Sequence, residues 1–260
     1  MNDLSASSAP SSAQSPAVDL LRRWDAQQTA YIKHRDQRFD AMAETVARLC
    51  GESPRILDLA CGPGSTSVAI LNRLPMAKIV AVDKDPALLA IARDVFANTP
   101  NVEVLECDLE TSDWPAGTEG AFDAVISSTA LHWLSPDALA RLYFALADRL
   151  RVGGVFLNAD HLLYGRDQPT LAALAKQDDE SNQSEAFGSG TDTWDGWWDL
   201  VAANPRYAEA AAQREHVWKD KAPPPYVTLG FHLETLRSAG FREVGTIWQY
   251  LDDYIACAIR

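Results

Sequence analysis

Residues 55–83, RILDLACGPGSTSVAILNRLPMAKIVAVD, decide the fold that this chain is expected to adopt. A short apolar run ends in the turn Gly62-Pro63-Gly64, and a helical pattern begins directly after it. A second apolar run, KIVAVD, closes the stretch at Asp83. Strand, glycine turn, helix and strand in this order predict a βαβ unit, in which the two strands lie parallel.

The same alternation continues on the C-terminal side of this unit. Apolar runs that predict further strands stand at 102–108, 122–128 and 152–160, and Pro86 and Ser135 mark the starts of two helices between them. Proline is tolerated in the first turn of a helix, and serine is a common N-cap. Alternating strands and helices predict a parallel sheet that is covered by helices on both faces.

The domain boundaries follow from composition and periodicity. Residues 1–16 are rich in Ser, Ala and Pro and lack the features of a secretory signal, so we expect a disordered N-terminus there. Residues 17–260 are expected to form a single domain. Its first part, 17–50, carries apolar residues at spacings of three, four and seven, which predicts an N-terminal helical lid.

The alternation stops after His161. Residues 162–228 show no clear strand, and we interpret them as a helical cap insert. Within the insert, 178–192 is polar and rich in Gly and Ser, which predicts a mobile loop, whereas 193–205 predicts a helix with three tryptophans. The last stretch, 243–260, predicts two strands joined as a hairpin.

The glycine turn by itself is compatible with several ligands. A dinucleotide fingerprint needs a third glycine where this chain has Ser67, and a phosphate-binding loop needs Gly-Lys-Ser/Thr, which is absent. An acid, Asp58, stands four residues before Gly62. Its carboxylate fits a ligand with a cationic amino-acid end, and it equally fits a structural role in which it bonds to the amides of the loop.

Acids also stand at the ends of the next two predicted strands. Asp83 ends the second strand, where a carboxylate can accept hydrogen bonds from ribose hydroxyls. Asp108 follows the third strand, where a carboxylate can accept from an adenine amine while Leu109 packs on the ring. Each acid alone is as typical of a helix cap or a solvated loop. Acids at three successive strands together indicate a nucleoside site with an amino-acid end.

These residues resemble a known family. LDLACGPGSTS (57–67), AVDKDPALLAIAR (81–93), ECDLE (106–110) and FDAVISSTALHWL (122–134) are similar to motifs I, post-I, II and IV of the class I methyltransferases that use S-adenosylmethionine (SAM). The resemblance covers roughly 50–160 and implies an α/β Rossmann-like fold with a seven-stranded, mostly parallel sheet in the order 3-2-1-4-5-7-6. ALHWL further resembles the small-molecule branch that includes the trans-aconitate methyltransferases.

The resemblance also implies how the chain would hold SAM. The glycine loop would contact the methionine end, and Ser127 at the end of the fourth strand would line the same side. In related enzymes an N-terminal helix closes over SAM, so Arg35 would bind the SAM carboxylate or an acidic substrate; the alternative is a solvated surface arginine. The residues expected to bind SAM are Asp58, Ala60, Cys61, Gly62, Gly64, Asp83, Lys84, Asp108, Leu109, Ser127, Tyr31 and Arg35.

On the acceptor side, the candidate catalytic residue is His132, which follows the predicted fourth strand. It could act as a base or orient the acceptor by a hydrogen bond, and the alternative is a histidine that only packs beside Trp133. Aromatic side chains in the lid and cap are typical of core packing and equally of a roof over an apolar acceptor. The residues expected to line the acceptor site are Trp24, Trp133, His161, Trp194, Trp197 and Trp198.

The amino-acid composition limits the classes of partner that this chain is expected to bind. The chain has 23 Lys and Arg against 36 Asp and Glu, a formal net charge of −13, which disfavours binding to a phosphate backbone. No apolar run has the length of a membrane span. The four cysteines show no metal-ligand or disulfide spacing, so we expect no metal and a cytoplasmic location. A homodimer is left open.

The sequence therefore predicts a SAM-dependent methyltransferase that moves the sulfonium methyl by direct displacement to an oxygen, carboxylate or hydroxyl, of a small-molecule acceptor. An RNA methyltransferase and a non-catalytic SAM-binding regulator remain as alternatives. Base-amino methyltransferases carry Asn/Asp-Pro-Pro-Tyr after the fourth strand, whereas residues 127–130 read SSTA here. The intact SAM motifs disfavour the regulator and leave it open.

Overall fold

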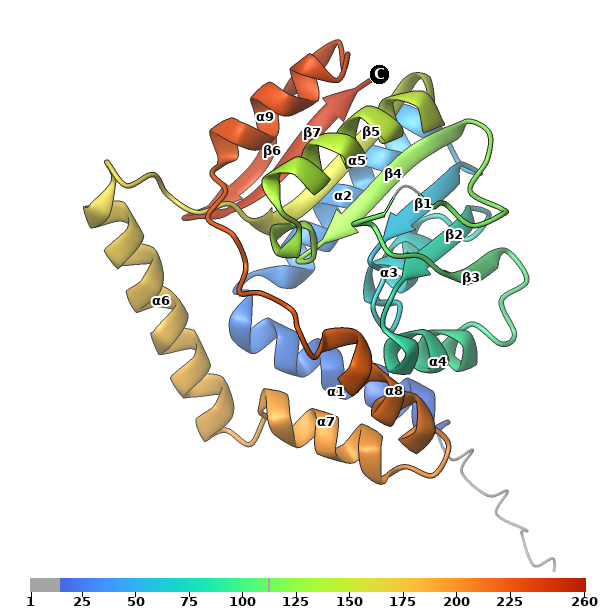
Figure 1. Ribbon diagram of the computed structural model, residues 1–260, viewed down its shortest axis with the longest axis vertical. Coiled ribbons are helices and arrows are strands. Elements are labelled where there is room, and N and C mark those ends of the chain that lie inside the picture. The colour runs from blue at the N-terminus through green and yellow to red at the C-terminus, as the bar shows by residue number, and fades with distance from the viewer. Residues whose placement is uncertain (1–14, 112) are drawn as a thin grey trace, which may run out of the picture.

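The computed structural model describes residues 15–111 and 113–260. In these residues, seven strands form one sheet in the order β3-β2-β1-β4-β5-β7-β6, with β7 antiparallel to its neighbours (Figure 1). This confirms the predicted fold class and strand order. Most of the predicted disordered N-terminus, 1–14, lies outside the described residues. The strands are β1 (Arg55–Leu59), β2 (Lys78–Asp83), β3 (Val102–Glu106), β4 (Phe122–Ser128), β5 (Leu150–His161), β6 (Glu243–Tyr250) and β7 (Asp253–Ile259).

The parallel strands β1 to β4 end along one edge of the sheet. Leu59 of β1 is paired with Val82 of β2 and with Ser127 of β4. Asp83, the last residue of β2, is paired with Glu106, the last residue of β3. Ligands of open α/β sheets bind at this edge, outside the carboxyl ends of the strands. The register therefore brings the segments that follow four strands to one place.

Helices cover both faces of the sheet. On one face, α2 and α3 pack on the strands through contacts such as Met42 with the layer that contains Ile126. On the other face, α5 and α9 pack through the layer that contains Leu142 and Phe156. The helices are α1 (Pro16–Tyr31), α2 (Arg35–Cys50), α3 (Ser65–Arg73), α4 (Pro86–Val95), the 3-10 turn η1 (Leu131–Trp133), α5 (Pro136–Arg149), α6 (Pro169–Gly188), α7 (Trp194–Ala203), α8 (Ala208–Trp218) and α9 (Leu229–Ser238).

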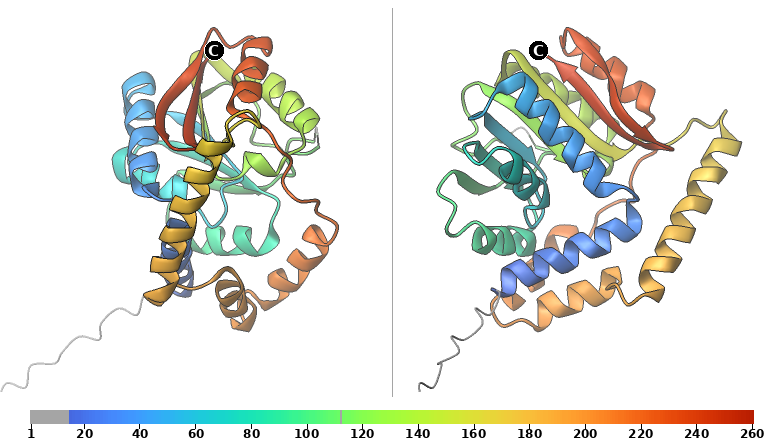
Figure 2. Two further views of the ribbon diagram at one scale, coloured as in Figure 1. Left: turned by 90° about the vertical axis from the view of Figure 1, so that its left-hand side faces the viewer. Right: turned by 180° about the vertical axis from the view of Figure 1, so that it is seen from behind.

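A third apolar cluster lies beyond the carboxyl ends of the strands. It joins α1, α4 and α7 through Leu20, Leu88 and Trp197, and Tyr207 completes it. In Figures 1 and 2, α1, α7 and α8 form a layer across this edge of the sheet, and α6 runs beside them, away from the sheet. The predicted cap insert is thus helical, and it lies over the edge where a ligand would bind.

The predicted mobile loop at 178–192 is wrong for most of its length, because α6 runs through to Gly188. The sequence hides this helix because only Ala175 is buried, so its polar residues show no apolar stripe. The helix is anchored by specific contacts instead: Asn182 donates to the carbonyls of Thr29 and Ala30 at the end of α1. The helix predicted at 193–205 and the terminal hairpin are confirmed.

The N-terminal lid contains two helices, α1 and α2, in agreement with the prediction of N-terminal helices. The chain breaks at Ile32–His34, where Ile32 is fully buried in an extended conformation and His34 has a φ of +62°. The break sends α1 across the strand ends while α2 packs on the face of the sheet. Among the described residues, no helix is long and apolar enough to cross a membrane.

Candidate active site

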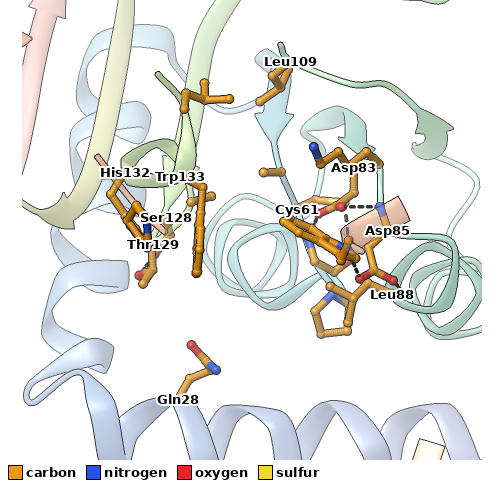
Figure 3. Close-up of a pocket in the computed structure, with 18 of the residues that line it drawn as sticks. Gln28, Cys61, Asp83, Asp85, Leu88, Leu109, Ser128, Thr129, His132 and Trp133 are labelled. Atoms are coloured by element: carbon orange, nitrogen blue, oxygen red, sulfur yellow. Dashed lines mark hydrogen bonds between the residues drawn. The ribbon is translucent and has the colours of Figure 1, made fainter. Parts of the chain in front are cut away.

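A cavity of about 930 Å³ lies between the carboxyl ends of the strands and the layer formed by α1, α7 and α8. Figure 3 shows His132 and Trp133 on one side of it and Cys61 and Asp83 on the other, with Gln28 extending from α1. We call the strand-end residues the cofactor floor: Ala60, Cys61, Gly62, Ser65, Asp83, Lys84, Asp108 and Leu109. We call the tryptophans opposite them the aromatic roof: Trp24, Trp194, Trp198 and Trp218.

The glycine loop gives the floor an open backbone surface. Ala60 and Gly62 both have positive φ, +52° and +57°, and a Cβ on Gly62 would meet nothing within 4 Å among the described residues. A ligand can therefore approach this backbone closely. Gly64 has a different reason to be glycine, since a Cβ there would lie 2.5 Å from the Phe96 ring. It does not line the cavity, so we propose no ligand contact for Gly64.

Asp83 joins the glycine loop to the start of α4. Its Oδ2 accepts from the backbone N of Gly62 at 2.8 Å and its Oδ1 from the backbone N of Asp85 at 2.8 Å. Burial raises the pKa of this carboxyl to about 6. The side chain still faces the cavity (Figure 3), as the predicted ribose contact requires.

Asp58 lies behind the glycine loop and does not line the cavity. Its Oδ2 accepts from Ser67 Oγ at 2.6 Å, and its Oδ1 is buried without a hydrogen-bond partner among the described residues. Burial raises the pKa of Asp58 to about 7. These contacts go to Ser67 in the first turn of α3 and not to an amide of the loop, so they support a structural role for Asp58 at the start of that helix rather than direct binding. Ser127 does not line the cavity either, and its Oγ donates to the carbonyl of Leu59.

At the third strand, Lys84, Asp108 and Leu109 all line the cavity. Lys84 Nζ lies 3.5 Å from Asp108 Oδ2, and its ammonium is 4.9 Å from the centre of the Trp218 ring. Asp108 Oδ1 accepts from the backbone N of Glu110 at 3.0 Å. The floor therefore offers a carboxylate and an apolar side chain together at the place where an adenine ring is expected.

His132 is held by a buried carboxylate that sequence reasoning did not assign. Its Nδ1 lies 2.6 Å from Asp160 Oδ1, and its backbone N donates to Asp160 Oδ2 at 3.0 Å. Asp160, near the end of β5, is fully buried. Burial lowers the pKa of His132, but the negative charge of Asp160 and its hydrogen bond together raise the pKa by more than burial lowers it. The pKa of His132 therefore lies above its ordinary value. An acid at a strand end was the signal that would have identified Asp160.

His161 belongs to a second buried network beside this pair. Its Nδ1 lies 3.1 Å from Asp253 Oδ1, which also accepts from Arg38 Nη1 at 2.9 Å. Arg38 is fully buried and donates further to Thr129 Oγ1 and to the carbonyl of Ala159. The guanidinium thus joins α2 to the ends of β4, β5 and β7. His161 lines the cavity, as expected for the acceptor side.

The three tryptophans of α7 divide into two roles. Trp194 and Trp198 line the cavity, whereas Trp197 is fully buried and its Nε1 donates to the carbonyl of Leu20 at 3.1 Å. Trp24 of α1 packs edge-on against Trp197, with ring centres 4.7 Å apart. Trp197 therefore anchors the roof and does not contact the cavity. Trp218 completes the roof and was missed, because a lone tryptophan at the end of a polar helix gives no periodic signal.

Four side chains of α1 and α2 line the cavity: Trp24, Gln28, Tyr31 and Arg35. Arg35 is buried and forms an ion pair with Asp25, with Nη1 2.7 Å from Oδ1. The surface-arginine alternative is therefore wrong. Of the residues predicted from sequence, Asp58, Gly64, Ser127 and Trp197 do not reach the cavity, and the others line it.

Comparison with known proteins places this geometry in a family. The family described as "methyltransferase domain" matches residues 56–154. A trans-aconitate 2-methyltransferase of Variovorax paradoxus is 30% identical over 222 residues, 82% of this chain and 78% of that relative. Another of Azoarcus sp. is 34% identical over 133 residues, 51% of this chain and 48% of the relative.

A solved structure gives the same fold. Human N-acetylserotonin methyltransferase, crystallised in complex with SAM, superposes with a TM-score of 0.55 and 17% identity over 92% of this chain and 55% of that chain. The sequence similarity to the Variovorax relative spans most of both chains, and the strand order and glycine loop agree with it. This chain belongs to the class I SAM-dependent methyltransferases.

Proposed function

We propose that this enzyme transfers the methyl group of SAM to an oxygen of a small-molecule acceptor, either a carboxylate or a hydroxyl. The observation that carries the proposal is a single cavity bounded by the cofactor floor, the aromatic roof and His132. Its volume of about 930 Å³ is near the upper end of the roughly 300–1,000 Å³ typical of ligand pockets. That volume suits two ligands side by side better than a nucleoside alone.

The floor fits SAM by its own polar groups. Asp83 can accept from the ribose hydroxyls, and Asp108 can accept from the adenine amine while Leu109 packs on the ring. Ser65 lines the cavity with a buried Oγ that has no hydrogen-bond partner among the described residues, which suits the polar end of the methionine part. Buried polar groups normally have partners, so an orphaned hydroxyl in a cavity wall favours a bound polar ligand.

The residues on the acceptor side align the acceptor and exclude water. SAM supplies an already activated methyl group, so alignment and desolvation account for much of the rate. Trp133 and the aromatic roof surround the space next to the floor with apolar surface. His132, fixed by Asp160, lines the same space, and its ring nitrogen that does not bond to Asp160 can take a proton or donate a hydrogen bond.

The relatives support a small-molecule acceptor, since two of them are named for methylation of trans-aconitate. The net charge of −13 supports the same class over a nucleic acid.

The proposal is tested by methyl transfer from isotopically labelled SAM to a mixed metabolite panel, with mass spectrometry of the products. We expect one labelled small-molecule product with the methyl on oxygen, and S-adenosylhomocysteine (SAH) in equal amount. Labelled RNA or protein in place of a small molecule, or binding of SAM without any turnover across the panel, would contradict it.

A further inference from the structure

One segment of the cap, residues 208–226, is not anchored by any buried side chain of its own. The structure describes all of these residues, and none of them is buried. The residues at the two ends, Tyr207 and Val227, are only 2% and 7% exposed. Between these two anchors lie α8 and the irregular stretch that leads to α9 (Figure 1). We call residues 208–226 the flap.

The flap has few apolar contacts with the rest of the molecule. Its contacts with the third apolar cluster come from two partly buried alanines, Ala210 and Ala211. The neighbouring helix α7, in contrast, places the fully buried Trp197 in that cluster. Elements with few buried apolar contacts open locally at a low cost in free energy. The flap is therefore expected to open while α7 stays in place.

Polar contacts to two acids hold the flap closed. Trp218 Nε1 donates to Asp85 Oδ2 at 2.9 Å, and Arg214 Nε forms an ion pair with the same oxygen at 2.8 Å. Further along the flap, Lys221 Nζ contacts Glu110 Oε1. We call Asp85 and Glu110 the latch acids. Because every one of these contacts joins two groups of the protein, closure of the flap does not require a ligand.

Each latch acid is fixed to an acid of the cofactor floor. Asp83 Oδ1 accepts from the backbone N of Asp85 at 2.8 Å, and Asp108 Oδ1 accepts from the backbone N of Glu110 at 3.0 Å. Figure 3 shows Asp85 beside Asp83. The closed flap therefore bridges the segments that follow β2 and β3. A ligand whose ribose meets Asp83 and whose adenine meets Asp108 would lie beneath it.

Side chains of the flap also form the wall of the cavity over this nucleoside end. Trp218, Arg214 and Lys221 all line the cavity. The ammonium of Lys84, in the floor, lies 4.9 Å from the centre of the Trp218 ring. The guanidinium carbon of Arg214 lies 3.7 Å from the centre of the Trp198 ring. Opening of the flap would remove this wall and expose the nucleoside end of the floor.

We propose that the flap is the gate through which the cofactor enters and leaves, and that the latch acids control it. SAM enters and SAH leaves when Asp85 and Glu110 release the flap, as with lids that limit product release in other enzymes. Since the flap closes without help from the ligand, closure slows entry and exit by the same factor and leaves the equilibrium affinity unchanged. This inference rests on the placement of SAM on the cofactor floor, and it does not depend on the acceptor.

The substitution Asp85→Asn opens the latch and preserves the helix that follows. Asp85 Oδ1 caps α4 by accepting from the backbone N of Ala87 and of Leu88, and an asparagine carbonyl caps a helix equally well. The amide nitrogen in place of Oδ2 cannot accept from Trp218 and gives Arg214 no charge to pair with. Loss of a hydrogen bond to a charged group should shift the opening equilibrium by about tenfold or more.

The gate is tested by the rates of cofactor exchange. Release is measured by chasing labelled SAH with unlabelled SAH, and association by stopped-flow tryptophan fluorescence. We expect Asp85→Asn to raise both rates about tenfold, with the Kd from calorimetry within about twofold of the wild-type value. Trp218→Phe, which keeps a ring but loses the donor, should raise both rates by a smaller factor. Glu215→Gln, at an exposed position of α8, is the matched control and should change neither rate.

Two results would overturn the gate. Wild-type rates in a folded Asp85→Asn protein would mean that the flap does not limit exchange. Faster release with unchanged association, and therefore a weaker Kd, would mean that the flap is a static wall that binds the cofactor. If Asp85→Asn fails to fold, Trp218→Phe and Lys221→Gln apply the same test from outside α4. Absence of SAH binding to the wild-type protein is a distinct result, which would overturn the proposed function as well.

Hydrogen exchange gives a readout that does not depend on the ligand. In the wild-type protein the backbone amides of α8 should exchange faster than those of α7, because Trp197 anchors α7 alone. Asp85→Asn should speed exchange across residues 208–226 and leave α7 unchanged. Equal protection of α7 and α8 that the substitution does not alter would contradict an independently opening flap.

Discussion

The cofactor floor and the aromatic roof face each other across one cavity but are assembled in different ways. Floor residues follow their strands directly, and Asp83 bonds to a loop only 21 residues away in sequence. Roof contacts join distant segments: Arg23 of α1 binds Asp192 at 2.7 Å, and Trp218 Nε1 donates to Asp85 Oδ2 at 2.9 Å. The floor is therefore set by the sheet, whereas the roof is set by helix packing outside it.

This difference in assembly predicts that substitutions in the floor and substitutions in the roof affect the binding of different ligands. Backbone amides and buried carboxylates of the floor have fixed positions, so substitutions there should change SAM affinity. Roof side chains belong to α1, α7 and α8, which pack on one another and on α4 outside the sheet. Substitutions there should change acceptor binding and leave SAM affinity nearly constant.

The largest effect is expected from Asp83→Ala, in the floor. The substitution removes the carboxylate that we propose holds the ribose, and with it the acceptor for the Gly62 amide. Hydrogen bonds to a charged group are worth about 1.5–3 kcal/mol each, so SAH should bind about 100-fold more weakly or worse. Calorimetric titration measures the affinity, and thermal unfolding confirms that the variant is folded. Unchanged SAH affinity in a folded variant would mean that Asp83 does not hold the ribose.

A substitution of similar energy at Trp197, which anchors the roof, should change stability rather than SAH affinity. Trp197→Ala empties a fully buried site, which typically costs about 3–5 kcal/mol of unfolding free energy. Denaturant unfolding should show this loss, and the acceptor KM should rise. Trp194→Ala, 40% exposed on the same helix, is the control for the stability measurement alone and should cost much less. A Trp197→Ala protein with wild-type stability would show that the roof is not packed as described.

The affinity for SAH should also depend on pH. Burial raises the pKa values of Asp83 and Asp58 to about 6 and about 7, so both are partly protonated in the free protein near pH 6. Donation from ribose hydroxyls favours the ionised carboxylate, so binding should release protons and SAH affinity should rise with pH. Asp83 alone predicts about a fourfold increase from about pH 5.5 to about pH 7.5. Calorimetry across this range measures it, and affinity that falls with pH would reverse the assignment.

The smallest effect is expected where α8 meets α4. Arg206 binds Asp94 through two hydrogen bonds of 2.7 and 2.5 Å, and Tyr207 donates to the same carboxylate. Arg206 is largely exposed, so the pair contributes little energy. Asp94→Ala should raise the acceptor KM about two- to threefold without changing SAH affinity. A change in SAH affinity instead would mean that the roof and the floor are coupled.

The same contrast explains what the sequence could predict. The strand order and most of the floor were predictable, because Asp83, Asp108 and the glycine turn lie at strand ends that short motifs identify. Asp58 was ambiguous because an acid beside a loop gives one pattern for both direct binding and loop support. Asp160 obeys the strand-end rule, but its role depends on the bond to His132 across the site, a tertiary contact that the sequence of β5 does not reveal.

The roof was less predictable for a physical reason. Periodicity reveals an apolar stripe but not which side chain turns inward, so Trp197 could not be told from Trp194 and Trp198. The helix α6 has almost no buried face, so its sequence favours a loop. The break at His34, which directs α1 over the cavity, depends on a left-handed backbone that its residue type does not announce.

The central claim is that the cofactor floor binds the methyl donor, and calorimetric titration of the purified chain with SAH tests it most directly. The structure predicts a single site per chain with a Kd of roughly micromolar order or tighter, corresponding to about −8 kcal/mol. Absence of a binding signal at high micromolar SAH, with the protein shown to be folded, would contradict it.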